Sequence, residues 1–67
     1  MPVVQISVRQ GRPAENLRKM ISAVTHAVAD SLNAPLESIR VIVTEVPLTH
    51  WATGDVTLQE KQDRPND

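Results

Sequence analysis

Proline at position 2 is the first residue of this chain whose type and place suggest chemistry. A small residue after the initiator Met normally permits the removal of Met1, which would leave the secondary amine of Pro2 at the amino terminus. An α-amino group titrates near pH ~8, and burial beside cations lowers its pKa towards that of a working general base. The competing interpretation is that Pro2 only begins a strand, where its missing N–H is tolerated. With Met1 retained, the Pro2 nitrogen is an amide and cannot act as a base.

Arg9, Arg12 and Arg40 are the candidate anion-binding residues. Guanidinium groups bind carboxylates through paired hydrogen bonds and stay charged in apolar surroundings. Arg12 falls in the turn after the first predicted strand and Arg40 opens the second, so both stand at strand ends, where a site would draw its ligands. Arg9 is the weakest candidate taken alone. The competing interpretation pairs these arginines on the surface with Glu37 or Glu45.

Trp51 is the single aromatic residue of the chain. It is expected either to form the apolar wall of a small pocket, where it helps to keep a base neutral, or to cap a contact between subunits. The two roles are compatible if the pocket lies at the interface. His26 falls on the polar face of the predicted helix, and His50 has no nucleophile or carboxylate partner in the sequence. We therefore expect neither histidine to take part in the chemistry.

The composition excludes several classes of site. The chain has no cysteine and only two histidines, so thiol chemistry and disulfides are ruled out and neither a metal nor a cofactor is expected. Seven basic against eight acidic side chains give a net charge of −1, which argues against nucleic acid or an anionic membrane as a partner. No apolar run approaches the ~20 residues of a membrane span, so a cytoplasmic protein is the default expectation.

The elements that must position these residues read as one β-α-β unit. Residues Pro2 to Arg9 alternate in polarity with a period of two, which predicts a strand. Helical spacing of apolar residues predicts a helix from Ala14 to about Asn33, and Pro35 ends it. A second strand is predicted over residues 39–46, parallel to the first. The apolar positions of the helix are Leu17, Met20, Ile21, Val24, Val28 and Leu32.

The remainder of the chain predicts a small appendage and an assembly. Gly54-Asp55 predicts a short hairpin within residues 48–57, and residues 59–67 are expected to form a polar tail after a domain of residues 1–58. The fold class is therefore α/β, with parallel strands, one helix and a C-terminal hairpin. One helix leaves the other face of the sheet bare, and a chain of 67 residues is marginally stable alone. We therefore expect an oligomer.

Taken together, these features resemble the 4-oxalocrotonate tautomerase family. The resemblance covers roughly residues 2 to 58 and is carried by Met1-Pro2, the strand to Gly11-Arg12, the amphipathic helix, the stretch 32–41 and His50-Trp51. It implies an isomerase that ketonises a 2-hydroxydienoate such as 2-hydroxymuconate, a small unsaturated carboxylate, without a cofactor. The reaction would belong to aromatic hydrocarbon catabolism or to a biosynthetic branch of similar chemistry. It also implies a homohexamer, usually a trimer of dimers, with active sites at subunit boundaries.

The resemblance also implies a role for each candidate. Pro2 is then the general base, Arg12 holds the distal carboxylate, and Arg40 from a neighbouring subunit binds the 2-oxygen and the adjacent carboxylate. Trp51 stands where the family usually has Phe. Proton transfer from an enol oxygen to carbon needs a base of near-neutral pKa and positive charge where the dienolate oxygen becomes negative. An amine among arginines meets both needs.

One departure from the tautomerase pattern supports a second hypothesis about the function. Arg9 stands where an aliphatic residue is usual and resembles the trans-3-chloroacrylate dehalogenase branch, in which paired arginines bind the substrate carboxylate. That branch uses a glutamate to activate water, and the matching position here is Thr53, with Asp55 and Glu45 as the nearest alternatives. A hydratase-type dehalogenase is therefore the runner-up. A third reading, favoured if Met1 is retained, is a non-catalytic subunit of a mixed hexamer.

Overall fold

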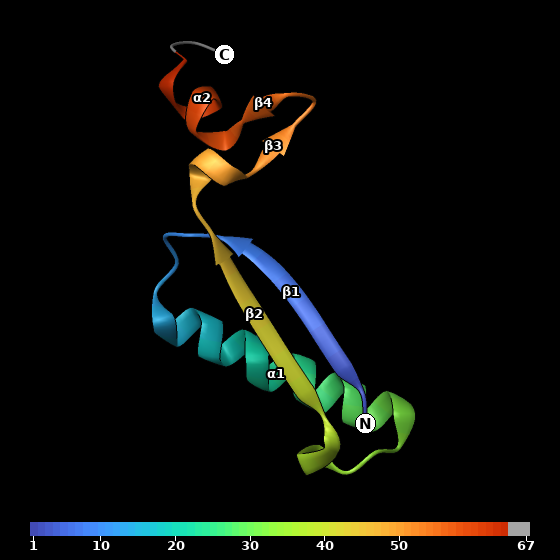
Figure 1. Cartoon of the computed structure of the whole chain (residues 1–67). Helices are drawn as coiled ribbons and strands as arrows, with labels where there is room; N and C mark the ends of the chain where they lie inside the picture. The colour runs from blue at the N-terminus through green and yellow to red at the C-terminus, as the bar shows by residue number, and fades with distance from the viewer. Residues whose placement is uncertain (65–67) are drawn as a thin grey trace.

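A computed structural model describes residues 1–64 and shows a β-α-β unit followed by a small C-terminal lobe (Figure 1). The unit consists of β1, α1 and β2, and the lobe projects from the carboxyl end of its sheet. The bounds of the elements are β1 Val3–Arg9, α1 Ala14–Leu32, β2 Arg40–Val46, β3 Ala52–Thr53, β4 Val56–Thr57 and α2 Leu58–Asp63, with single 3-10 turns at Leu36–Ser38 and Leu48–His50.

The two long strands pair in parallel, as the sequence predicts. Their register runs from Val3 opposite Arg40 to Arg9 opposite Val46. Along β1 the side chains alternate between exposed and half-buried, and β2 follows the same alternation over most of its length. The half-buried face is the one that α1 covers, and the other face is open in the single chain (Figure 1). The predicted α/β fold with parallel strands is therefore confirmed.

The helix α1 begins and ends close to the predicted positions. It follows Pro13, whose fixed φ suits a helix start, and it stops at Asn33, which adopts the left-handed region at φ 54° and donates its N–H to the Ala29 carbonyl. Leu32, the last apolar position of the predicted helix, is 62% exposed in the single chain. A 19-residue helix is about 28 Å long, longer than a seven-residue strand of roughly 23 Å, so its last turn extends past the sheet.

The single chain buries little of its surface. Among the described residues only Ala29 and Ile39 are buried, while Val3 and Ile42 on the open sheet face are about half exposed. The accessible surface is 5137 Å², whereas a compact monomer of 7.4 kDa would expose roughly 4,200 Å². The radius of gyration of 15.7 Å likewise exceeds the roughly 11 Å of a compact chain of this length. The bare face that the sequence predicts is present.

The C-terminal lobe contains the predicted hairpin and one helix that was not predicted. β3 and β4 pair antiparallel, and Gly54 and Asp55 between them both have positive φ, as a two-residue hairpin turn requires. Residues 59–63, expected as part of a polar tail, instead belong to α2. Residues 65–67 of that tail lie outside the described residues. In the described part of the chain, no helix is long and apolar enough to cross a membrane.

A capping box explains why α2 forms. The Glu60 N–H donates to the Thr57 hydroxyl at 3.0 Å, and the Thr57 N–H donates to the Glu60 carboxylate at 2.9 Å. These two bonds satisfy backbone donors that a helix start otherwise leaves unpaired. The Leu58 N–H also donates to the Trp51 carbonyl at 2.8 Å. The start of α2 is therefore fixed relative to the loop that carries Trp51.

Candidate active site

The predicted site residues fall into two groups at opposite ends of the β1–β2 sheet. Pro2 precedes β1 and Arg40 begins β2, and the Arg40 N–H donates to the Pro2 carbonyl at 3.0 Å. Arg9 ends β1, Arg12 follows it by three residues, and Trp51 lies in the C-terminal lobe. The seven residues of β1 span roughly 23 Å at ~3.3 Å per residue. One chain therefore brings Arg9, Arg12 and Trp51 together but keeps them away from Pro2.

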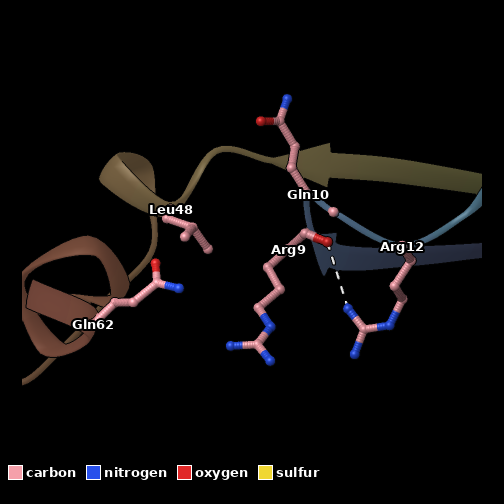
Figure 2. A pocket seen from close by; sticks show the side chains of 6 residues that line it. Arg9, Gln10, Arg12, Leu48 and Gln62 are labelled. Atoms are coloured by element: carbon pink, nitrogen blue, oxygen red, sulfur yellow. Dashed lines mark hydrogen bonds between the residues drawn. The ribbon is translucent and has the colours of Figure 1, made fainter.

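Three cavities, of about 410, 350 and 300 Å³, surround Arg9 at the carboxyl end of the sheet. The 350 Å³ cavity brings Arg9 and Arg12 together with Trp51. In the largest cavity the Arg9 side chain extends between Arg12 and Gln62 (Figure 2). Volumes of this size accommodate a small organic ligand. The residues that line the 350 Å³ cavity are Ser7, Val8, Arg9, Arg12, Trp51 and Leu58.

The turn between β1 and α1 places the two guanidinium groups at the same cavities. Gly11 has a backbone φ of +121°, a value that residues with a Cβ atom rarely adopt. Arg12 folds back, and its Nη1 donates to the Arg9 carbonyl at 3.5 Å (Figure 2). No acidic side chain among the described residues lines any of the three cavities. Two arginines without a neighbouring carboxylate form a site for an anion, and their planar groups suit a carboxylate.

The structure does not pair the arginines with the surface carboxylates named as alternatives. Arg40 is exposed, and its Nη1 donates to the backbone carbonyl of Glu37 at 3.1 Å. Glu45 stands opposite Val8 in the strand register and lines none of the three cavities. Within the part of the chain that the structure describes, Arg9, Arg12 and Arg40 have no ion pair. Their charges therefore remain available to a ligand or to a second chain.

The amino-terminal residues lie just before β1, at the end of the sheet opposite Arg9. Pro2 is half-buried and Met1 is 81% exposed. The Met1–Pro2 bond is therefore accessible, although the Pro2 nitrogen is an amide while Met1 is attached. Removal of Met1 would expose a secondary amine beside the first residue of β2, Arg40.

The two histidines and the residues considered for water activation do not join either group. The His26 ring lies 2.8 Å from the Ser22 carbonyl within α1, and the His50 ring lies 2.8 Å from the Thr49 hydroxyl. Thr53 and Asp55, considered for water activation, are exposed in the hairpin and line none of the three cavities. Among the described residues, no three His, Cys, Asp or Glu side chains gather where they could hold a metal ion.

Sequence reasoning missed the contribution of the C-terminal lobe to these cavities. Leu48 and Leu58 form apolar walls beside Arg9, and Lys61 and Gln62 reach the same region from α2. The signal that could have revealed them is the Thr57-x-x-Glu60 pattern, which is typical of a helix start. A helix beginning at Leu58 would have turned residues expected in a tail into candidate cavity residues.

Comparison with known proteins agrees with this geometry. The family model described as "Tautomerase enzyme" matches residues 2–61. A probable tautomerase of Ralstonia nicotianae is 37% identical over 67 residues, covering 100% of this chain and 96% of that protein. A 2-hydroxymuconate tautomerase of Stutzerimonas stutzeri is 44% identical over 54 residues, covering 81% of this chain and 86% of its own length.

A solved structure shares the fold. The heterohexamer 4-oxalocrotonate tautomerase of Chloroflexus aurantiacus J-10-fl superposes with a TM-score of 0.85 at 33% identity, covering 90% of this chain and 97% of that one. The similarity thus extends over both the β-α-β unit and most of the C-terminal lobe. The chain belongs to the tautomerase family and is an isomerase of the 4-oxalocrotonate tautomerase type.

Proposed function

We propose that an assembly of this chain ketonises a 2-hydroxydienoate such as 2-hydroxymuconate, with Pro2 as the general base. The observation that carries this proposal is the cavity that joins Arg9, Arg12 and the Trp51 ring without an acidic side chain among the described residues. Such a site suits a flat, unsaturated carboxylate. The 44% identity to a protein named 2-hydroxymuconate tautomerase supports this substrate class, and with it a place in the breakdown of aromatic compounds.

The proposed reaction moves one proton and rearranges two double bonds. The neutral Pro2 amine, free after Met1 is removed, takes the proton from the 2-hydroxyl group. The electron pair left on oxygen forms the 2-keto group, and the diene electrons shift towards C5, which takes the proton back from the Pro2 ammonium. Arg40 of a neighbouring copy stabilises the negative charge that develops on the 2-oxygen. Arg12 binds the distal carboxylate throughout.

The proposed site requires more than one copy of the chain. Pro2 and Arg12 lie at opposite ends of β1, so Pro2 of one copy must meet Arg12 of another. The open sheet face, with Val3 and Ile42 about half exposed, supplies apolar surface for such contacts. We propose a hexamer built as a trimer of dimers, in which each active site lies at a boundary between subunits.

The hydratase reading is less well supported. Arg9 lines all three cavities, as paired carboxylate-binding arginines would require, but hydration also needs a group that activates water. No described acidic residue lines those cavities, so the described part of one chain does not supply that group there. Ketonisation needs no water and is therefore the function that the arrangement supports best.

Two measurements on the purified chain test the proposal. Mass spectrometry shows whether Met1 has been removed, and the absorbance of 2-hydroxymuconate follows its ketonisation. We expect loss of Met1 and turnover of 2-hydroxymuconate. A processed chain that hydrates 3-chloroacrylate without ketonising 2-hydroxymuconate would replace the proposal with the hydratase. A chain that retains Met1 and turns over neither compound would be a non-catalytic subunit.

A further inference from the structure

We propose that the substrate groove continues from the Arg9–Arg12 pair to α2, where Lys61 binds the far carboxylate of a 2-hydroxydienedioate longer than 2-hydroxymuconate. This inference rests on the proposed function and specifies the substrate class of the same site. It assigns Lys61, which the sequence placed in a polar tail, as a residue that determines substrate length.

The cavities around Arg9 are adjacent and share lining residues. The 300 Å³ cavity is lined by Arg9, Leu48, Leu58, Lys61 and Gln62. Two of these residues, Arg9 and Leu58, also line the cavity that contains Arg12 and Trp51. A ligand that lies against the Trp51 ring can therefore extend past Leu58 and Arg9 into the space beside Lys61.

The chemistry of the extension suits an apolar arm with an anionic end. Leu48 and Leu58 offer methyl groups to methylene carbons, whereas Lys61 offers a positive charge and Gln62 an amide at the far side. Lys61 has no ion pair within the described residues, and no described acidic side chain lines this cavity. A carboxylate from the ligand would therefore supply the opposite charge.

The backbone of α2 at Lys61 is held in place by the local structure of the lobe. The Thr57–Glu60 capping box fixes the first turn of α2, and the hydrogen bond from the Leu58 N–H to the Trp51 carbonyl, at 2.8 Å, joins α2 to the Trp51 loop. The distance between Trp51 and Lys61 is thereby constrained by backbone contacts. Such a fixed separation favours ligands of one length over another.

The test compares two substrates that differ only in length. The kcat/KM for 2-hydroxyocta-2,4-dienedioate is divided by that for 2-hydroxymuconate, in the wild-type chain and in Lys61→Gln. We expect this ratio to fall about fivefold in Lys61→Gln, mostly through KM, because an exposed charge pair contributes modestly. Lys61→Arg keeps the charge and should restore most of the ratio. Lys19→Gln, which removes a charge from α1 away from the cavities, should leave the ratio unchanged.

The outcomes separate this inference from the proposed function. If the wild-type chain ketonises both diacids and Lys61→Gln leaves their ratio unchanged, the extended groove is wrong while the proposed function stands. If neither diacid turns over, the proposed function fails, and binding of octanedioate and hexanedioate, followed by the NMR signal of the Trp51 indole N–H, decides the matter. If Lys61→Gln weakens the binding of octanedioate more than that of hexanedioate, the extended groove is supported. If the wild type and Lys61→Gln bind octanedioate equally well, the extended groove is wrong.

Discussion

The arginines at the end of β1 differ from ordinary surface arginines in what surrounds them. An arginine that stabilises a fold usually has a carboxylate partner in its own chain, and even then contributes little when exposed. Arg9 and Arg12 instead share one cavity with Trp51 and have no acidic neighbour there among the described residues. Placing uncompensated positive charges side by side costs stability, so an arrangement of this kind indicates ligand binding.

The two proposed arginine roles predict different kinetic effects. Arg12→Ala should raise KM for 2-hydroxymuconate by roughly 10- to 100-fold with a small change in kcat, because the distal carboxylate keeps its charge throughout the reaction. Arg40→Ala should lower kcat by about 100-fold, because charge develops on the oxygen that it faces. Steady-state kinetics of both variants measure this difference, and equal changes in KM and kcat would contradict the assignment.

The role of Pro2 predicts that activity depends on removal of Met1. A preparation that retains Met1 should show no ketonisation above background, because its Pro2 nitrogen is an amide. Treatment of the same preparation with methionine aminopeptidase should produce activity in proportion to the loss of the Met1 mass, and the exposed Met1 side chain makes this cleavage feasible. Mass spectrometry and the absorbance assay are followed in parallel. Full activity before treatment would remove Pro2 from the mechanism.

At the scale of elements, periodicity predicted the scaffold because each long element has one face that is less exposed than the other. The alternation in residues 3–9 and the helical spacing after Ala14 reflect burial against each other, so strands and helix were found within one or two residues. The short α2 lacks such a face and depends on the Thr57–Glu60 capping box. Because the sequence analysis assigned these residues to a tail, it did not identify Lys61 and Gln62 as cavity residues.

The capping box makes the stability of α2 dependent on pH. The Thr57 backbone N–H donates a hydrogen bond to the Glu60 carboxylate, and the Thr57 side chain adds to its effect, so the pKa of Glu60 lies below its ordinary value of 4.5. Because the folded-state pKa is lowered, the capping contribution is complete above pH 4.5 and is lost as the pH falls through the lowered value. The NMR shift of the Thr57 amide should therefore change in that acidic range.

Two variants isolate the carboxylate in this prediction. Glu60→Gln can still accept a hydrogen bond from the Thr57 N–H, so the Thr57 amide shift should lose its dependence on pH while the helix persists. Glu60→Ala removes the acceptor and should weaken α2 at every pH. A Thr57 amide that titrates equally in the wild type and in Glu60→Gln would show that another group causes the change.

At the scale of the molecule, the sequence predicts that one chain leaves a face of its sheet uncovered, but it does not predict how the copies are arranged around that face. The lack of a second covering layer followed from one helix and two strands, and the surface of 5137 Å² agrees with it. The contacts between chains determine which ends of neighbouring copies lie together. These contacts cannot be read from the sequence of one chain. The separation of Pro2 from Arg12 along β1 nevertheless restricts the assembly to arrangements in which the site is shared.

A shared site predicts that two impaired variants restore each other. Pro2→Ala and Arg12→Ala should each have low activity when refolded alone. If Pro2 and Arg12 of one site come from different copies, unfolding the two variants together and refolding them gives about one site in four with both wild-type residues, by random pairing. The mixture should then reach about a quarter of the wild-type rate. If both residues came from one chain, no site in the mixture would be intact and activity would stay low.

A second mixture provides the control for exchange between chains. Wild-type chains refolded with an equal amount of the double variant Pro2→Ala/Arg12→Ala should also give about one intact site in four when sites are shared, against about one in two when they are not. The two mixtures should therefore show equal rates. Unequal rates, with the first mixture near zero and the second near half of wild type, would place Pro2 and Arg12 of each site in the same chain, and the roughly 23 Å that β1 spans would then have to be closed within one copy.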